Sequence, residues 1–118
     1  MITKFELFES LNIGEPKFYD YVICSTDSPE IKEFVSNHIG QITRVFHEGE
    51  TKPVGYDDFM VEYGRENIPE KLNTFYFLHG NHSGWRGFKR EDIIYWSKDK
   101  EDLEKIIQKK LAINRFDL

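Results

Sequence analysis

The sequence predicts a mainly β fold with two helices, in which five short strands form a small, partly open barrel. Five stretches rich in aromatic and β-branched residues alternate with turn signals, at 18–24, 41–46, 59–63, 74–78 and 88–97. Within the barrel region and after it, two stretches have helical periodicity, at about 28–38 and about 99–113. Because a parallel sheet needs a crossover helix between most of its strands, two helices are too few for one.

The length of 118 residues gives room for one domain with a single core. We expect an N-terminal arm or short helix over 1–13, the barrel over 17–97 and the C-terminal helix over 98–113. Aromatic residues make up 15% of the chain, including ten Phe and six Tyr, so that few residues suffice for a core. This composition argues against disorder.

The beginning of the chain contains signals for an arm followed by a strand. Apolar residues recur at every third position from Ile2, which suits a short helix or an arm packed on the domain, although alternation around Leu7 also suits a strand. Gly14 and Pro16 end this segment. The aromatic and β-branched run at 18–24 is then the first strand.

The inserted helix has a recognisable start and end. Ser28 is the expected N-cap, Pro29 occupies the first helical position and Glu30 lies at the positive end of the helix dipole. Gly40 ends the helix. The alternation of polar and apolar residues at 41–46 then predicts a half-buried strand.

The second half of the chain reads as strands separated by loops. A loop rich in glycine and proline at 48–55 precedes the strand at 59–63. Pro69 excludes a long helix before the strand at 74–78. A glycine-rich loop at 79–87 follows, and the last strand runs from Phe88 to Ser97 around the apolar run IIYW.

The C-terminal helix has the clearest signals. Ser97 or Asp99 is the expected N-cap, the first turn is acidic and the end is basic, which matches the helix dipole. Four apolar residues form one stripe along it, which we expect to pack on the barrel: Leu103, Ile106, Ile107 and Leu111.

Acidic and basic residues are unevenly distributed along the chain. Residues 1–70 contain fourteen acidic residues against six Lys and Arg, whereas residues 71–118 contain seven against ten. Because affinity for nucleic acid comes mostly from neutralising phosphates, a net charge of −5 argues against general nucleic-acid binding. Most of the basic C-terminal surplus is expected on the solvent face of the last helix.

We expect no membrane segment, secretion signal or disulfide. No apolar run approaches the ~18 residues needed to cross a bilayer. The opening MITKFELFES carries two glutamates where a secretory signal would be apolar. The single cysteine, Cys24, lies in an apolar run and is expected to be a small buried hydrophobe. The chain is thus expected to be cytoplasmic, without a cofactor, and a monomer or small homo-oligomer.

Short motifs in the predicted strands resemble those of SH3-like barrels of the KOW and Tudor kind: DYVIC at 20–24, IGQI at 39–42, FMVEY at 59–63 and FKREDIIYWS at 88–97. The opening TKFELF at 3–8 and the run IIYWS before a charged helix also resemble small uncharacterised proteins of tailed bacteriophages. The likeness covers about residues 18–97 and implies an SH3-like barrel in a phage-encoded protein. The chain departs from it in the inserted helix and in the loop at 79–87.

Candidate functional side chains concentrate in the stretch HGNHSGWRGF at 79–88, predicted as a loop. It offers planar rings, positive charge and adaptable hydrogen-bonding groups, and rings and arginines dominate interaction hot spots. The alternative is a structural lid, in which Trp85 and Phe88 cover the open end of the barrel. If the stretch at 79–88 is instead a recognition surface, it and the strand after it supply the predicted ligand- or partner-binding residues. These are His79, Asn81, His82, Trp85, Arg86, Lys89, Arg90 and Tyr95. Tyr95 and Trp96 alternate along a strand, so only one of them can face the core.

The same stretch does not favour a metal site or an active site. The spacing of His79 and His82 has no fixed geometry on a loop, and no acid or cysteine lies within eight residues. Ser83 beside His82 lacks a third catalytic partner. A strand follows the glycines, whereas a phosphate-binding loop precedes a helix. A solvated strand edge explains the clustered acids better than catalysis does: Asp57, Asp58 and Glu62.

We therefore expect a non-enzymatic binding module, a phage accessory protein that binds and inhibits a host defence protein. The alternative is a nucleotide-binding or nucleotide-sequestering protein. In that case Trp85 or Tyr95 would stack on a base, and three cations would bind phosphate: Arg86, Lys89 and Arg90. The expected partner is thus a host protein or a small nucleotide.

Overall fold

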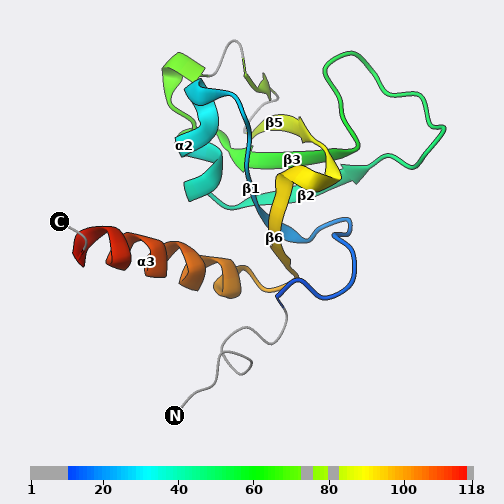
Figure 1. Cartoon of the computed structure of the whole chain (residues 1–118). Helices are drawn as coiled ribbons and strands as arrows, with labels where there is room; N and C mark the ends of the chain where they lie inside the picture. Colours follow the sequence, from blue (N-terminus) through cyan, green and yellow to red (C-terminus); the bar gives the residue numbers. More distant parts are fainter. Residues whose placement is uncertain (1–10, 73–75, 80–82, 117–118) are drawn as a thin grey trace.

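A computed structural model describes residues 11–72, 76–79 and 83–116 of the chain (Figure 1). Within these ranges the strands are β1 Tyr21–Cys24, β2 Gly40–Val45, β3 Phe59–Gly64, β4 Leu78–His79, β5 Ser83–Phe88 and β6 Ile93–Ser97. The α-helices are α2 Pro29–Asn37 and α3 Lys100–Phe116, and the short 3-10 helices are η1 Arg65–Asn67, η2 Glu70–Leu72 and η3 Arg90–Asp92. Neither described α-helix is long and apolar enough to span a membrane.

The described strands form one antiparallel sheet in the order β4-β5-β3-β2-β1-β6. Five of the strands have four to six residues, and β4 has two. The last strand, β6, pairs with the first, β1. Because β4 and β6 are the two edges, the sheet is not closed. The prediction of an antiparallel, open sheet with two α-helices is therefore confirmed, although the described fold is mixed α and β rather than mainly β, and the SH3-like barrel stays a prediction.

The segment at 79–88 corrects the sequence prediction of a loop. Its second part, 83–88, is strand β5, which pairs with β3 over six residue pairs from Phe59–Phe88 to Gly64–Ser83. The prediction was wrong because glycines were read as loop signals. In a strand a glycine can instead mark the close approach of another backbone, and a Cβ at Gly87 would lie 2.6 Å from the backbone nitrogen of Asp57.

Two further boundaries differ from the prediction. Helix η3 separates β5 from β6, so the last strand begins at Ile93 rather than at Phe88. Of the strand predicted at 74–78, residues 74–75 lie outside the described residues, and Tyr76 and Phe77 belong to no strand. Residues 1–10 of the predicted arm also lie outside the described ranges, and 11–20 form turns and irregular backbone.

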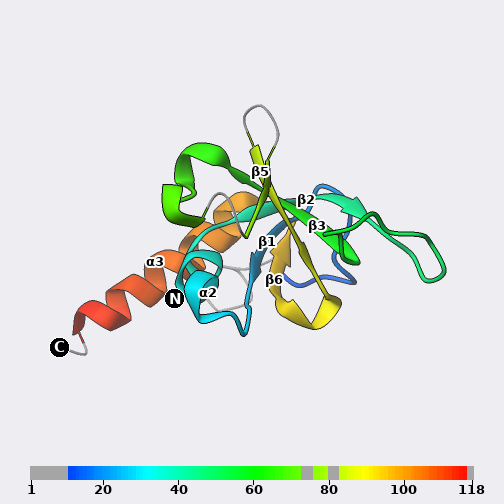
Figure 2. The same cartoon turned by 90° about the horizontal axis from the view of Figure 1, so that it is seen from above.

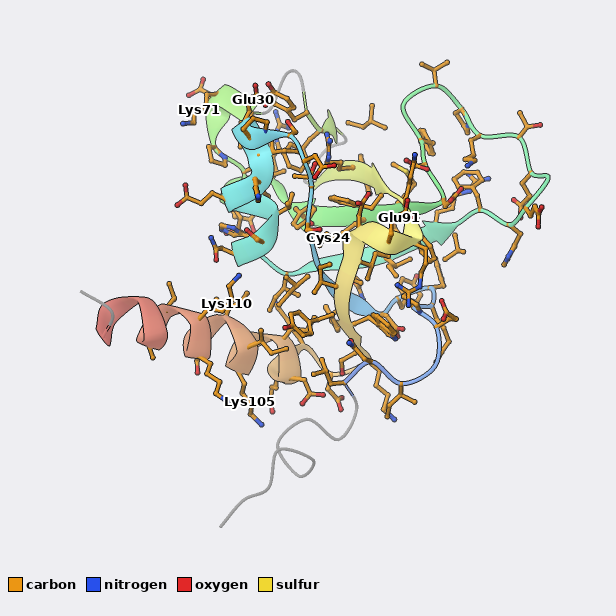
Figure 3. The ribbon with its side chains drawn as sticks, in the orientation of Figure 1. Cys24, Glu30, Lys71, Glu91, Lys105 and Lys110 are labelled. Carbon is orange, nitrogen blue, oxygen red and sulfur yellow. The ribbon has the colours of Figure 1, made fainter. Side chains whose placement is uncertain are left out.

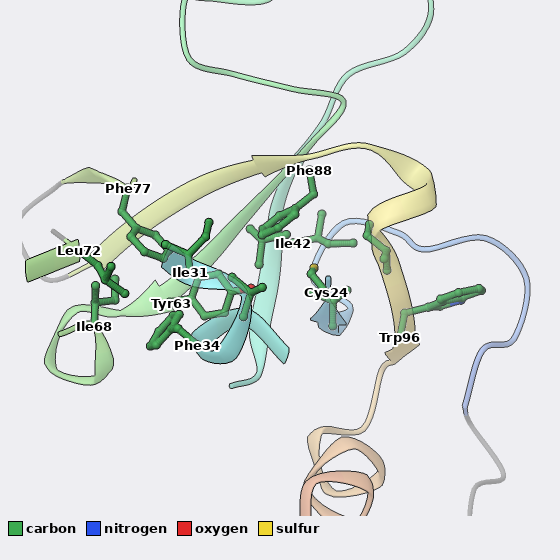
Figure 4. Packing of buried hydrophobic residues seen from close by; sticks show 14 residues of the cluster. Cys24, Ile31, Phe34, Ile42, Tyr63, Ile68, Leu72, Phe77, Phe88 and Trp96 are labelled. Atoms are coloured by element: carbon green, nitrogen blue, oxygen red, sulfur yellow. The ribbon is translucent and has the colours of Figure 1, made fainter. Parts of the chain in front are cut away.

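The core lies between α2 and one face of the sheet. Three residues of α2 are buried there, namely Ile31, Phe34 and Val35. The rings of Phe34, Tyr63 and Phe77 contact one another edge to face, with centroids 5.4 to 5.8 Å apart. Figure 4 shows these rings at one end of the core and Trp96 at the other. Such ring pairs add to the stabilisation that burial alone provides.

Cys24 lies in this core with only 1% of its surface exposed. Burial raises the pKa of its thiol far above the ordinary value, because the thiolate would be desolvated. The expectation of a small buried hydrophobe is therefore confirmed.

Helix α3 packs on the sheet through its first turns only. Leu103 is completely buried, Ile106 and Ile107 are half-buried, and Leu111 is 54% exposed. The prediction that the whole apolar stripe packs on the barrel was therefore wrong for Leu111. Figure 1 shows α3 running along the underside of the molecule, and in Figure 3 Lys110 points from α3 toward α2. The Nζ of Lys110 donates a hydrogen bond to the carbonyl oxygen of Ser36, at 3.1 Å.

The start of α3 is fixed by a buried polar pair. The Ser97 hydroxyl accepts a hydrogen bond from the backbone N–H of Asp99 and donates one to the carboxylate of Asp102, at 3.0 and 2.9 Å. Both Ser97 and Asp102 are buried. Helix α3 begins at Lys100, directly after the two predicted cap positions, and ends at Phe116 rather than at about 113.

The edge of β6 is occupied by Asn12. Its backbone N–H donates to the carbonyl of Trp96, and its side-chain Oδ1 accepts the Trp96 N–H, both at 2.8 Å. Its Nδ2 donates to the carbonyl of Ile94 at 3.3 Å. Trp96 itself belongs to the core, whereas Tyr95 is only half-buried. The sequence left open which of these two aromatic residues faces the core, and the structure selects Trp96.

Candidate functional site

The structure brings together only two of the predicted recognition residues. Trp85 and Arg86, on β5, line the same groove. Lys89 and Arg90 lie beyond the end of β5, at η3, and Tyr95 is on β6 at the far edge of the sheet. The remaining predictions fall on the side chain of His79 and on Asn81 and His82, which lie outside the described residues.

The groove containing Trp85 has a volume of about 430 Å³ and is formed by three segments. We call it the Trp85 groove. Its walls are the end of the β2–β3 loop, the segment that leads into β4, and the middle of β5. The residues that line it are Gly55, Tyr56, Asp57, Tyr76, Phe77, Leu78, Trp85, Arg86 and Gly87.

The β2–β3 loop forms one wall of the groove because two glycines allow it to turn back. Gly49 and Gly55 have φ angles of +89° and +88°, which other residues adopt only with strain. An ion pair between Lys52 and Asp58 joins the two sides of the loop. Figure 2 shows this loop projecting from the sheet, away from α3. Its returning arm is the part that meets β5 at Gly87.

Replacing Gly87 with alanine should change the shape of this wall. The added Cβ would meet the backbone nitrogen of Asp57 at 2.6 Å and its Cβ at 2.8 Å, so the β2–β3 loop must move away from β5. We expect a loss of about 1 to 3 kcal/mol in the free energy of unfolding, as for other overpacked contacts. Urea denaturation measures this loss. NMR shifts concentrated in 55–58 and 85–88 would locate the change, whereas unchanged shifts there would contradict the close approach.

Trp85 is half-buried and lies between two hollows. In the sheet it is opposite Glu62 on β3 and Leu78 on β4. Tyr56 and Trp85 also line a smaller hollow of about 200 Å³ together with Thr43, Arg44 and Met60.

Apolar residues around the groove remain exposed to solvent. Tyr56 and Leu78 are each 37% exposed, and Val54, in the loop beside them, is fully exposed. Apolar side chains thus remain exposed at and beside the groove, although its lining also contains polar residues.

Arg86 follows Trp85 on β5, so its side chain points to the opposite, core-facing side of the sheet, where the guanidinium lies 5.8 Å from the ring centroid of Phe88. It is half-buried, and its Nη1 donates a hydrogen bond to the carbonyl oxygen of Tyr76 at 2.9 Å. Its Nε is buried and has no hydrogen-bond partner among the described residues. Burial lowers the pKa of Arg86, against a smaller opposite influence of Tyr63 and Asp92. The guanidinium is thus held in place and partly desolvated.

No described carboxylate forms an ion pair with Arg86. Ion pairs elsewhere in the described part of the chain include Lys52–Asp58 and Arg90–Glu15. Asp57 lines the same groove, but its Oδ1 accepts the backbone N–H of Asp58 at 2.8 Å.

Arg90 is held by contacts within the protein. Its guanidinium lies 4.4 Å from the ring centroid of Trp96, forms an ion pair with Glu15 at 2.6 Å and donates to the Ile93 carbonyl at 3.4 Å. These contacts join residue 15 to β6. Lys89 is exposed at the start of η3. Neither cation lines the Trp85 groove.

Sequence reasoning missed the part of the groove that precedes β5. The ring of Tyr56 and the segment at 76–78 carried no motif, because they reach the site only through the turn of the β2–β3 loop. The sequence signal for this part of the groove is the run VGYDD at 54–58, in which an aromatic residue directly follows a glycine and precedes two acids. Those acids were assigned to a solvated strand edge instead.

A larger hollow of about 570 Å³ lies at the opposite end of the molecule, between segment 13–20 and the β6–α3 turn. Its buried carboxylate, Asp20, accepts the backbone N–H of Lys17 at 2.9 Å. In the described ranges, no group of three His, Cys, Asp or Glu could hold a metal ion. The expectation that His79 and His82 bind no metal stays a prediction.

Comparison of the chain with protein-family models, curated proteins and solved structures found no match.

Proposed function

We propose that this chain is a non-enzymatic binding module that recognises a partner protein through the Trp85 groove. The observation that carries the proposal is the group of partly exposed aromatic and apolar side chains at the groove, namely Trp85, Tyr56 and Leu78. Tryptophan, tyrosine and arginine are the residues most enriched among interface hot spots, and they contribute most when a partner excludes water from them. Trp85 and Tyr56 provide two of these residue types on the same face of the sheet, where they line a common hollow with Met60.

The geometry favours a protein over a nucleotide as the partner. A nucleotide site was expected to combine a stacking ring with the cations Arg86, Lys89 and Arg90. Of these, only Arg86 lines the groove, and Arg90 is bonded to Glu15 and Trp96. One guanidinium is a weak basis for holding the several charges of a nucleotide phosphate chain. An aromatic groove with one cation suits a protein side chain better.

The arrangement of strands supports the resemblance to SH3-like barrels. The pairing of the last strand with the first, the meander β1-β2-β3-β5 and the 3-10 helix before the last strand are compatible with such a barrel. The open sheet and the inserted α2 are departures from it. A phage origin and an inhibitory action on a host defence protein stay predictions.

The absence of catalysis is also a proposal, and the acids near the groove support it. General acid–base catalysis needs side chains that converge on a reacting atom. Asp57 accepts a hydrogen bond from its own loop, and Asp58 is paired with Lys52. These carboxylates stabilise the loop rather than face each other.

The proposal is tested with Trp85→Ala and a matched control, Leu111→Ala. Leu111 is an exposed apolar residue on α3, far from the groove in sequence and in the fold. The tagged chain is used to capture a partner from an extract of its source cells, and the identified partner is then purified and titrated by calorimetry. We expect Trp85→Ala to weaken binding by at least about tenfold, which corresponds to the loss of one hot-spot residue. Leu111→Ala should leave the Kd unchanged.

Two results would contradict the proposal. One is a partner whose Kd is unchanged in Trp85→Ala, which would place the binding surface elsewhere. The other is turnover of a substrate by the purified chain, lost together with a groove side chain. Circular dichroism of each variant checks that a change in Kd does not follow from unfolding.

A further inference from the structure

The outer face of strands β2, β3 and β5 contains a hollow that adjoins the Trp85 groove. Helix α2 packs on the opposite, core face of these strands, and α3 packs against β1 and β6. The hollow has a volume of about 200 Å³, and we call it the Met60 hollow. The residues that line it are Thr43, Arg44, Tyr56, Met60 and Trp85.

A β-bulge places Arg44 on this outer face. Ile42 pairs with Val61, and both side chains are completely buried in the core. The register between β2 and β3 then shifts between Ile42 and Arg44, so that Arg44 pairs with Met60 instead. Because directly paired residues share a face of the sheet, the extra residue turns Arg44 to the side of Met60, away from the core.

Trp85 lies on the same side as this cation. Its partner on β3 is Glu62, two residues after Met60, and side chains two residues apart on a strand point to the same face. Trp85 and Arg44 line one hollow. A ring and a cation therefore meet at a single site on the outer face.

The Arg44 guanidinium is oriented by neighbouring rings. Its Cζ lies 4.4 Å from the ring centroid of Phe46, and the Phe46 ring contacts Tyr56 edge to face, with centroids 5.9 Å apart. Arg44 is exposed, and no described carboxylate forms an ion pair with it. Its charge is thus held beside the hollow by stacking and is available to an anion.

The size and lining of the hollow fit one apolar side chain of a partner protein. Sites for whole small ligands usually have about 300 to 1,000 Å³, more than this hollow provides. Met60 forms its bottom and is 2% exposed. A thioether adapts its shape to different apolar groups and contacts aromatic rings favourably.

We propose that the Met60 hollow receives an apolar or aromatic side chain of a partner protein, next to an Asp or Glu that pairs with Arg44. This inference rests on the proposed function and narrows its partner to an acidic segment. Charge-assisted hydrogen bonds from Arg44 would hold the carboxylate, and Trp85 and Tyr56 would enclose the apolar side chain. Glu62 shares the outer face but does not line the hollow, so the acid is expected on the Arg44 side.

Three probes with different charges test the inference by NMR on the full chain: phenylacetate, phenylacetamide and phenethylamine. The chain contains two Met and two Trp, so the methyl signal of Met60 and the indole N–H of Trp85 are readily assigned. Trp96, in the core, is the internal control. We expect the acid to move the Met60 and Trp85 signals without moving Trp96, and to bind about threefold more tightly than the amide, the usual scale for an exposed charge pair. The amine should bind most weakly.

A pair of arginine variants assigns this preference to one side chain. Arg44→Gln should make the affinities for acid and amide equal. The matched control is Arg65→Gln, since Arg65 is exposed on η1 and does not line the hollow. It should leave the preference unchanged. A preference that persists in Arg44→Gln, or that is lost equally in both variants, would contradict the role of Arg44.

Three further results would overturn the inference. Equal affinities for acid and amide on the unaltered chain would show an apolar contact without charge recognition, and the proposed function would stand. Tighter binding of the amine would assign the preference to Glu62. A Met60 signal that no probe moves would exclude the hollow as a site. In that case the proposed function stands if Trp85→Ala weakens the binding of the captured partner, and it fails if the Kd is unchanged.

Discussion

Replacing Leu103 with aspartate is expected to lower the free energy of unfolding by about 3 to 4 kcal/mol, because a charge would be buried without a partner. Leu103 has no exposed surface and lies in the first turns of α3, next to the buried pair Ser97–Asp102. A second carboxylate near Asp102 would add repulsion. Since small domains are stable by only about 5 to 15 kcal/mol, the loss should be large in thermal or urea denaturation.

The matched substitution is Leu111→Asp, in the same helix and with the same chemical change. Leu111 is 54% exposed, so its substitution should alter stability by no more than about 0.5 kcal/mol. Ile107→Asp should lie between the two, because Ile107 is half-buried. Equal losses at 103 and 111 would mean that the end of α3 is covered in solution by another surface.

The two tryptophans should differ sharply in their contribution to stability. Trp96→Ala is expected to cost about 3 to 5 kcal/mol, as for other large core side chains. Its ring is 8% exposed, lies under the Arg90 guanidinium at 4.4 Å and donates from Nε1 to the Ile13 carbonyl at 3.4 Å. Trp85→Ala removes a half-buried ring beside two hollows and should cost about 1 kcal/mol.

This pair of variants answers whether Trp85 belongs to a structural lid or to a recognition surface. Both substitutions remove an indole from a strand, so the chemical change is the same. Urea denaturation followed by far-UV circular dichroism avoids the loss of the fluorescent residue. A loss of about 3 kcal/mol or more for Trp85→Ala would make its ring part of the core and contradict its role in recognition.

Local patterns predicted the elements whose signals are contained in adjacent residues. The start of α2 follows from Pro29 at its first position, whereas the prediction that Gly40 ends the helix was wrong, because His38 is the C-cap and Gly40 begins β2. Tight packing explains why Gly40 tolerates no side chain: a Cβ there would lie 2.2 Å from Val61 Cγ1. Strand β5 was missed because its signal is not local. Gly87 is required by the approach of the β2–β3 loop, about thirty residues earlier in the chain.

The candidate site also depends on contacts that adjacent residues in the sequence do not reveal. Trp85 and Arg86 were selected by residue type, and they do line a common groove. Arg90 has the same chemistry, but the ring of Trp96 and the carboxylate of Glu15 hold it in place. Residue type alone cannot separate a cation that faces a ligand from one that ties two segments together. That difference depends on contacts between residues far apart in the sequence.

Asn12 has a consequence for self-association. An exposed edge strand offers unpaired backbone groups to a second chain, and natural proteins protect such edges from aggregation. Here one asparagine uses its backbone and its side-chain amide to engage three backbone groups of β6. Ile94, which is 41% exposed on the same strand, would otherwise give that edge an apolar contact for a neighbouring molecule. Asn12 thus leaves fewer unpaired backbone groups on this edge for a second chain to pair with.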